Sequence, residues 1–224
     1  MQFTIKIFLY LCLAISANGV AANPNVKVFT DYLSSLQAVA IDFTQIDSHG
    51  QTASGKLIIQ KPHKFRLNYY APYPLLLLGN KNEVIMYDYG LVQTTRINAK
   101  DNMFNFLLVD SKDWQKNFKI EHIFKTDRNI IAKLYNYATE RTISIVLSSH
   151  PQLYKTSPSK SSSLKQIIVD EPDGNVIEVF IEHIQHISTV DKDLFFLPNP
   201  DVFGKPSRLS KDALAQKYKN VVGR

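Results

Sequence analysis

The sequence predicts a mainly β protein, built on an antiparallel sheet with one apolar and one polar face. The clearest segment is 64–69, where Phe65, Leu67 and Tyr69 alternate with polar residues. Alternation with a period of two is typical of a strand that is buried on one side only. Comparable short segments, separated by turn residues, recur along most of the chain. The function therefore depends on what the apolar face covers.

The first half of the chain is expected to begin with a helix over 26–36, where apolar residues recur every three to four positions. Pro72 and Pro74 limit the apolar run 75–78 to an edge strand or a loop exit. A second helix, capped by Asp101 or Asn102, is expected to run to Val109. The strands predicted in this half are 41–46, 55–60, 64–70, 83–88 and 91–97, with turns at 47–50, Pro62, 79–80 and 89–90.

In the second half, strands resume and a serine-rich stretch, 154–163, is expected to form a surface loop. An apolar run at 194–197 follows the last strand, and Ser210 can cap a terminal helix. No repeat of fixed period is present, which argues against a propeller or a solenoid. The strands predicted here are 118–125, 130–137, 141–148, 164–170 and 175–185, the last two joined by a turn at 172–174.

Residues 1–22 have the pattern of a secretory signal peptide. A head carrying Lys6 precedes an apolar run over 7–17, and Val20 and Ala22 stand at the positions that signal peptidase recognises. The run is too short to span a membrane, although an N-terminal membrane anchor is the alternative. We expect cleavage near Ala22 and a soluble mature protein in the periplasm.

The only cysteine, Cys12, lies inside that apolar run. A lipidated cysteine would stand at the cleavage boundary, so we expect neither a lipid anchor nor a disulfide in the mature chain. The formal net charge is +6, and +5 without Lys6. We expect a leader (1–22), one domain (23–204) and a basic tail with helical potential (205–224). The tail could contact acidic phospholipids or an acidic partner, or be simply solvated.

The sequence gives no sign of catalysis. His183 and His186 are three residues apart on a predicted strand, so they point to opposite faces and cannot share a metal ion. No nucleophile elbow, zinc-binding His-Glu-x-x-His motif or phosphate-binding glycine loop is present, and the eight glycines do not cluster. We therefore expect a protein that is not an enzyme and that has no metal site and no cofactor.

The predicted second helix is apolar nearly all round, with Met103, Phe104, Phe106, Leu107 and Leu108. A helix facing solvent would be amphipathic, so this one must cover something apolar. Two interpretations remain open. The helix is either an ordinary part of the core or a lid over an apolar cavity.

An ordered series of short sequence motifs runs through nearly the whole mature chain. In order they are the opening helix, Phe43-Thr44-Gln45, Gly55-x-Leu57, Lys61-Pro62, Phe65-Arg66, Asn80, Tyr87-Asp88, Gln93, the apolar helix, Asp113-Trp114, Leu164-Lys165-Gln166, Asp173-Gly174 and Phe195-Phe196 with Pro198. No single motif is specific, but together they resemble the periplasmic outer-membrane lipoprotein carriers, the LolA-like proteins.

The resemblance implies an incomplete antiparallel β-barrel with a concave apolar interior covered by short helices. It also implies a monomeric carrier that binds the acyl chains of lipoproteins. Such a carrier receives them from a releasing transporter in the inner membrane and passes them to an acceptor at the outer membrane. Phe65 matches a family position where cavity and lid meet. Lys61 stands where the best-known branch has an arginine that latches the lid, and lysine lacks the planar fork of arginine.

Combining alternation with the resemblance, we expect the concave face to carry Phe43, Leu57, Ile59, Phe65, Leu67, Tyr69, Ile85 and Tyr87. The lid is expected to comprise Met103, Phe104, Leu107 and Leu108, with Lys61 as the candidate latch. A slip of one residue would reverse a strand's assignments, and Ile58, Val84 and Met86 carry that risk.

Two other function classes share features of this sequence. One is a periplasmic lipid-binding sensor or receptor with the same fold. The other is a membrane-inserted outer-membrane β-barrel, whose strands would also alternate. Two apolar helices between the strands and the absence of a terminal aromatic strand argue against the latter.

Overall fold

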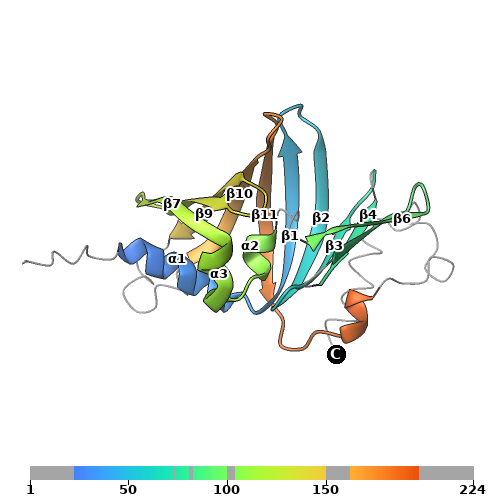
Figure 1. Ribbon diagram of the computed structural model, residues 1–224, viewed down its shortest axis with the longest axis horizontal. Helices are drawn as coiled ribbons and strands as arrows, with labels where there is room; N and C mark the ends of the chain where they lie inside the picture. The colour runs from blue at the N-terminus through green and yellow to red at the C-terminus, as the bar shows by residue number, and fades with distance from the viewer. Residues whose placement is uncertain (1–22, 73, 81–82, 100–103, 150–161, 197–224) are drawn as a thin grey trace, which may run out of the picture.

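The computed structural model describes residues 23–72, 74–80, 83–99, 104–149 and 162–196. Its main feature is an 11-stranded antiparallel sheet in the order β6-β5-β4-β3-β2-β1-β11-β10-β9-β8-β7. The sheet bends around its centre, β1 and β11, and its two sides fan apart (Figure 1). The chain thus forms an open barrel, which confirms the predicted fold class.

Most strands follow each other along the chain, so each pairs with its sequence neighbour, and β1 with β11 closes the two sides into one sheet. The first side comprises β1 (Ala38–Asp47), β2 (Thr52–Gln60), β3 (Lys64–Tyr69), β4 (Leu75–Gly79), β5 (Glu83–Asp88) and β6 (Gln93–Asn98). The second comprises β7 (Phe118–Lys125), β8 (Asn129–Asn136), β9 (Arg141–Ser149), β10 (Ser162–Asp170) and β11 (Val176–His186).

Three helices lie on the concave side of the sheet (Figure 1). They are α1 (Pro24–Ser35), α2 (Asn105–Leu108) and α3 (Ser111–Asn117). The side chain of Asn23 caps α1 by accepting a hydrogen bond from the backbone N–H of Asn25 at 3.0 Å, and Pro24 occupies the first turn. Helices α1 and α3 pack against β7, whereas α2 packs against β2.

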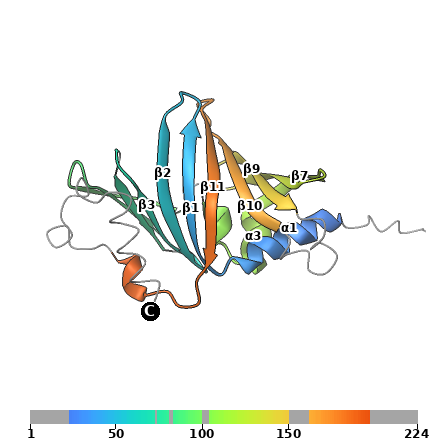
Figure 2. The same ribbon diagram turned by 180° about the vertical axis from the view of Figure 1, so that it is seen from behind.

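A 3-10 helix, η2 (Lys192–Phe195), lies on the opposite, convex side and contacts β3 (Figure 2). Arg66 of β3 reaches it by donating a hydrogen bond to the carbonyl of Leu194 at 3.0 Å. A small apolar cluster on this side includes Ala40, Ile58 and Ile187 with Leu194. The sheet is therefore buried on both faces near its centre.

Helix α1, the strand that begins at Phe118 and the hairpins of the second side lie within a few residues of their predicted positions. Four expectations were wrong. The second helix begins at Asn105 with Phe104 as its N-cap, rather than at a cap on Asp101 or Asn102. The run Leu75–Gly79 is an interior strand rather than an edge, because Pro74 precedes it and removes no ladder hydrogen bond. Ser162 and Ser163, at the end of the predicted loop 154–163, belong to β10, and helix α3 was not predicted. The helix expected after Ser210 lies outside the described residues.

Candidate functional site

The concave face of the sheet carries one large buried apolar cluster, to which five of the predicted cavity residues belong. These five are at most 2% exposed: Phe43, Leu57, Ile59, Phe65 and Leu67. They share a face because they occur as cross-strand neighbours: Leu57 lies opposite Leu67, and Ile59 opposite Phe65. Tyr69, also predicted, is partly buried and packs against the same cluster.

Two glycines make room for the largest side chains of this face. Phe43 lies opposite Gly55, and Phe65 lies opposite Gly79. A Cβ atom at Gly79 would run into the ring of Phe65, and one at Gly55 would lie 2.9 Å from the ring of Phe43. Each ring therefore lies across a glycine of the neighbouring strand. The sequence places both glycines in strand segments, but only the register shows which ring each one accommodates.

Tyr69 marks the end of this apolar surface. Its ring meets Phe43 edge to face, with centroids 5.6 Å apart, and its hydroxyl donates a hydrogen bond to Oε1 of Gln45 at 2.9 Å. Burial raises the pKa of the Tyr69 hydroxyl well above its ordinary value. The group thus stays neutral, which suits a wall that is otherwise apolar.

Ile85 and Tyr87 were assigned to the wrong face. In the observed register Tyr87 lies opposite Leu76 and Ile85 opposite Leu78, and both pairs are on the convex side. The residues of β5 in the concave phase are Val84 and Met86, of which Val84 belongs to the concave cluster. Both faces of β5 are apolar, so alternation alone could not fix the phase.

Helix α2 covers part of the concave cluster. Phe106, Leu107 and Leu108 are almost completely buried. The ring of Phe104, just before the helix, lies with its centroid 6.0 Å from that of Phe43. Of the predicted lid residues, Phe104, Leu107 and Leu108 therefore lie on the concave cluster, while Met103 is outside the described residues.

Lys61, in the β2–β3 turn, bonds to α1 rather than to α2. Its Nζ donates a hydrogen bond to the carbonyl of Leu33 at 2.7 Å, near the C-terminal end of α1. A cation is favoured there by the helix dipole. Burial lowers the pKa of Lys61 to about 8, and the carboxylate of Asp110 partly opposes this shift. In the same turn, the backbone N–H of His63 donates to the carbonyl of Leu108 at 3.1 Å, so this turn holds both helices.

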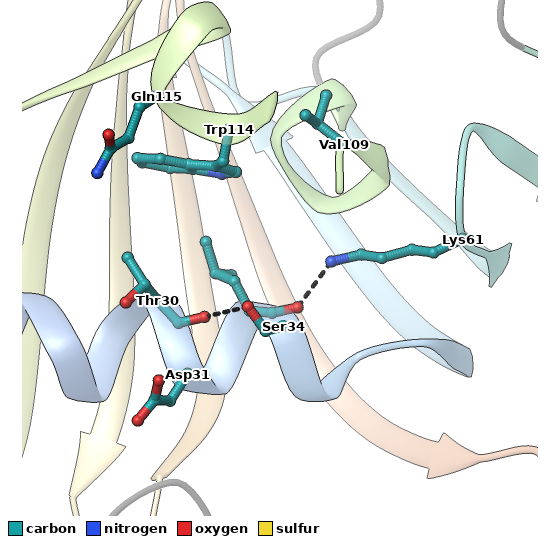
Figure 3. Close-up of a pocket in the computed structure, with 8 residues that line it drawn as sticks. Thr30, Asp31, Ser34, Lys61, Val109, Trp114 and Gln115 are labelled. Carbon is teal, nitrogen blue, oxygen red and sulfur yellow. Dashed lines mark hydrogen bonds between the residues drawn. The ribbon is translucent and has the colours of Figure 1, made fainter. Parts of the chain in front are cut away.

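Beside Lys61 lies a cavity of about 320 Å³ between α1 and α3 (Figure 3). Lys61 points into it from one end and Trp114 lies across from α1. Its remaining lining residues are Thr30, Asp31, Leu33, Ser34, Val109 and Gln115. The lining is partly polar, so this space differs in character from the apolar concave cluster.

The comparisons with known proteins identify the family. The family model described as the outer membrane lipoprotein carrier protein LolA matches residues 34–197. An uncharacterised protein of Rickettsia prowazekii is 36% identical over 210 residues, which are 93% of each chain. An outer-membrane lipoprotein carrier protein of Nitrosomonas europaea is 23% identical over 86% of this chain and 92% of its own. This chain belongs to the LolA family.

A carrier of the same name from Nitrosospira multiformis is 30% identical over 52% of this chain and 59% of its own. The crystal structure of a LolA superfamily protein from Nitrosomonas europaea aligns with 76% of this chain and 96% of its own, at a TM-score of 0.47 and 8% identity. LolA proteins are non-enzymatic carriers that bind lipoproteins in the periplasm. In the described part of this LolA protein, no helix is long and apolar enough to cross a membrane.

The position of Trp114 soon after the apolar helix predicts a structural anchor, and its contacts in this LolA protein confirm it; the elements that it joins were not predicted. Its ring packs edge to face on Phe29 of α1, with centroids 6.0 Å apart, and lies 5.3 Å from the ring of Phe118. Its indole Nε1 donates a hydrogen bond to the carbonyl of Phe106 in α2 at 3.3 Å. Trp114 thus connects all three helices on the concave side. The apolar Trp114 and Phe118, four residues apart, were the available signal for a helical turn.

Proposed function

We propose that this protein binds the acyl chains of lipoproteins on its concave face and shuttles them from the inner to the outer membrane. The observation that carries the proposal is a continuous apolar face, open at the sheet edges, whose cover is a short apolar helix. Each buried methylene contributes about 0.8 kcal/mol, so a chain of about 16 carbons contributes roughly 12 kcal/mol. That gain is large enough to hold an acylated protein in water.

In this proposal α2 is the lid. The ring of Phe104, just before α2, packs near that of Phe43, and the buried side chains of α2 belong to the same concave cluster. They occupy the space proposed for an acyl chain, so loading requires α2 to move outward. The helix has only four residues, and its described polar attachments are to the β2–β3 turn and to Trp114. A short helix held mainly by apolar contact can exchange those contacts for an acyl chain of similar character.

Lys61 would act as a latch on α1. The bond to the Leu33 carbonyl joins the β2–β3 turn to the end of α1, and the bond from His63 joins the same turn to α2. Opening of the concave face therefore strains or breaks contacts at one short turn. Lysine makes a single contact here, whereas an arginine could use two donors of its planar fork. A weak latch suits a carrier that must release its cargo.

We also propose that the chain is exported, is cleaved near Ala22 and works as a monomer in the periplasm. Its partners would be a lipoprotein-releasing transporter of the inner membrane and an acceptor at the outer membrane. The leader pattern and the family of periplasmic carriers support this location. An intact N-terminus on protein recovered from the periplasm would contradict the cleavage.

The decisive experiment combines loading with transfer. The cleaved protein is purified without detergent, and co-purifying molecules are identified by mass spectrometry. A loaded carrier holding a labelled lipoprotein is then mixed with outer-membrane acceptor, and transfer is followed over time. We expect acylated proteins in the first step and transfer in the second. If lipids load but acylated proteins do not, the protein is instead a lipid sensor or receptor of the same fold.

A further inference from the structure

The convex side of β4 and β5 carries an outer apolar patch, which is separate from the concave face. Its members are Leu76, Leu78, Ile85 and Tyr87, with the ring of Tyr89 stacked edge to face on Tyr87 at 4.8 Å. Leu76 is 0% exposed and Tyr87 is 5% exposed. Side chains on the outside of an open sheet reach such values only when something packs over them.

The described residues supply only part of that cover. On this side of the sheet, η2 is the described element that makes an extended contact, and it does so on β3 rather than on β4 or β5. Arg66 fixes η2 there: its Nε donates to Oδ1 of Asn68 at 2.8 Å, and its guanidinium also donates to the Leu194 carbonyl. The ammonium of Lys64 lies 6.0 Å from the ring centroid of Phe195. The chain is therefore brought to the border of the patch as it leaves η2.

The sequence that follows η2 contains apolar residues at a spacing that suits it to cover the patch. Residues 198–224 contain the spacing Leu214, Tyr218 and Val221, which places these three side chains on one face of a helix. The opposite face would carry Asp212, Gln216 and Lys219. Thirteen residues lie between Phe196 and Ser210, and a chain of that length can span about 45 Å when extended. The patch begins one strand away from η2, well within that reach.

We infer that the C-terminal segment, residues 198–224, docks its apolar side on the outer apolar patch of β4 and β5. The segment lies beyond the residues matched by the family model, which end at 197. Docking would explain why the patch is buried and would leave the six basic residues of the segment at the surface. The cover is intramolecular, which keeps this second apolar face from joining two copies of the protein.

The test uses engineered cysteines, because the mature chain has none of its own once Cys12 is removed with the leader. The pair Ile85→Cys with Leu214→Cys places one thiol on the patch and one on the segment. The matched control combines Leu214→Cys with Lys133→Cys, an exposed position on β8 of the other side of the sheet. Mild oxidation is followed by non-reducing electrophoresis and by mass spectrometry of the linked peptides.

We expect an intramolecular crosslink in the first pair at a yield at least five times that of the control. A truncated chain ending at Leu197 should bind several times more of an apolar fluorescent dye than the full chain. Crosslinked dimers through Ile85→Cys would show that a second copy covers the patch and would overturn the inference. Equal crosslinking in both pairs, together with unchanged dye binding after truncation, would overturn it as well.

Discussion

The two sides of the sheet differ in how many of their faces are buried. In the middle of β8 and β9, the concave residues are fully buried and their neighbours on the convex side are only half-buried or exposed; Ile145 and Val146 of β9 show this contrast. On the β2–β5 side, both faces are buried, and adjacent residues such as Ile58 and Ile59 belong to different clusters. The helices follow the same division, because α1 and α3 pack on the β7 side and α2 packs on β2.

This difference indicates that the two sides of the sheet have different roles. The β7–β10 side is an ordinary one-sided sheet that anchors α1 and α3. The β2–β5 side holds the covered apolar surface proposed for ligand. In that proposal its inner face parts from α2, so it needs support from its outer face. Covering the outer face with η2 and apolar side chains can keep the strands in register when the inner face is opened.

The largest effect is expected from truncating neighbouring residues in the two sides. Ile58→Ala and Ile59→Ala should each lower the free energy of unfolding by about 2–5 kcal/mol, because both side chains are buried. In β9, Ile145→Ala should cost as much, but Val146→Ala should cost less than about 1 kcal/mol. Denaturant unfolding of the four variants measures this. A small cost at Ile58 would mean that the outer face of β2 is not part of the folded core.

The same comparison explains how far the sequence could be used for prediction. On the β7–β10 side, apolar segments between turn residues gave the strand positions to within a few residues, and β7 was predicted to the residue although it carries a bulge between Ile120 and His122. On the β2–β5 side, strands were found but the phase of β5 was not, since Val84, Ile85, Met86 and Tyr87 are all apolar. Alternation carries no phase information when both faces are covered. Phe43 and Phe65 were placed correctly because their neighbours on the strand are polar or charged.

The site was predicted less completely, for a different reason. Lys61 was singled out by resemblance, but its partner is a backbone carbonyl at the end of α1, and a carbonyl leaves no mark in the sequence. The link from Trp114 to Phe106 is of the same kind, a side chain bonded to the backbone of another helix. Such contacts depend on how helices are placed on the sheet, which periodicity does not reveal.

The second effect concerns the glycines that hold the aromatic rings of the β2–β5 side. Gly79→Ala should destabilise the protein by about 1–3 kcal/mol, because the added methyl group displaces the Phe65 ring from the concave cluster. The matched control is Gly174→Ala in the β10–β11 turn, where nothing lies within 4 Å of the added atom and only the positive φ of 86° opposes it. The double variant Gly79→Ala with Phe65→Leu should recover part of the loss. No recovery would show that the methyl group clashes elsewhere.

The third effect separates a lid from an ordinary core helix. Leu107→Asp should reduce loading of an acylated protein at least tenfold while lowering stability by less than the concave truncation Leu134→Ala on β8. If α2 is a lid, it spends part of its time away from the sheet, and the charge of Leu107→Asp can then be solvated, so the loss of stability is small. The apolar contact between residue 107 and the ligand is lost, so loading falls. Loading is measured per folded molecule for both variants. Unchanged loading in a strongly destabilised Leu107→Asp protein would assign α2 to the core.

The fourth and smallest effect lies at the latch and depends on pH. Because burial lowers the pKa of Lys61 to about 8, the folded state loses its proton before the unfolded state, whose lysine titrates near 10.5. Between these values the unfolded state binds more protons, so the Lys61 contribution to stability rises as the pH increases from about 8 and levels off near 10.5. The same linkage favours the closed, buried lysine over an open, solvated one, so cargo release should slow as the pH rises through this window.

Lys61→Met removes this dependence, while Lys133→Met at a surface position should preserve it. The quantity to compare is the difference in unfolding free energy between wild type and each variant at pH 7.5 and 9.5. Tyrosines with raised pKa values, Tyr32 and Tyr69, are present in all three proteins and cancel in this difference. Lys61→Arg should stay charged throughout, and it should raise cargo retention only if its second donor finds a carbonyl at the end of α1. Faster release from the arginine variant would show that Lys61 is not a latch and that α1 stays closed through its apolar contacts alone.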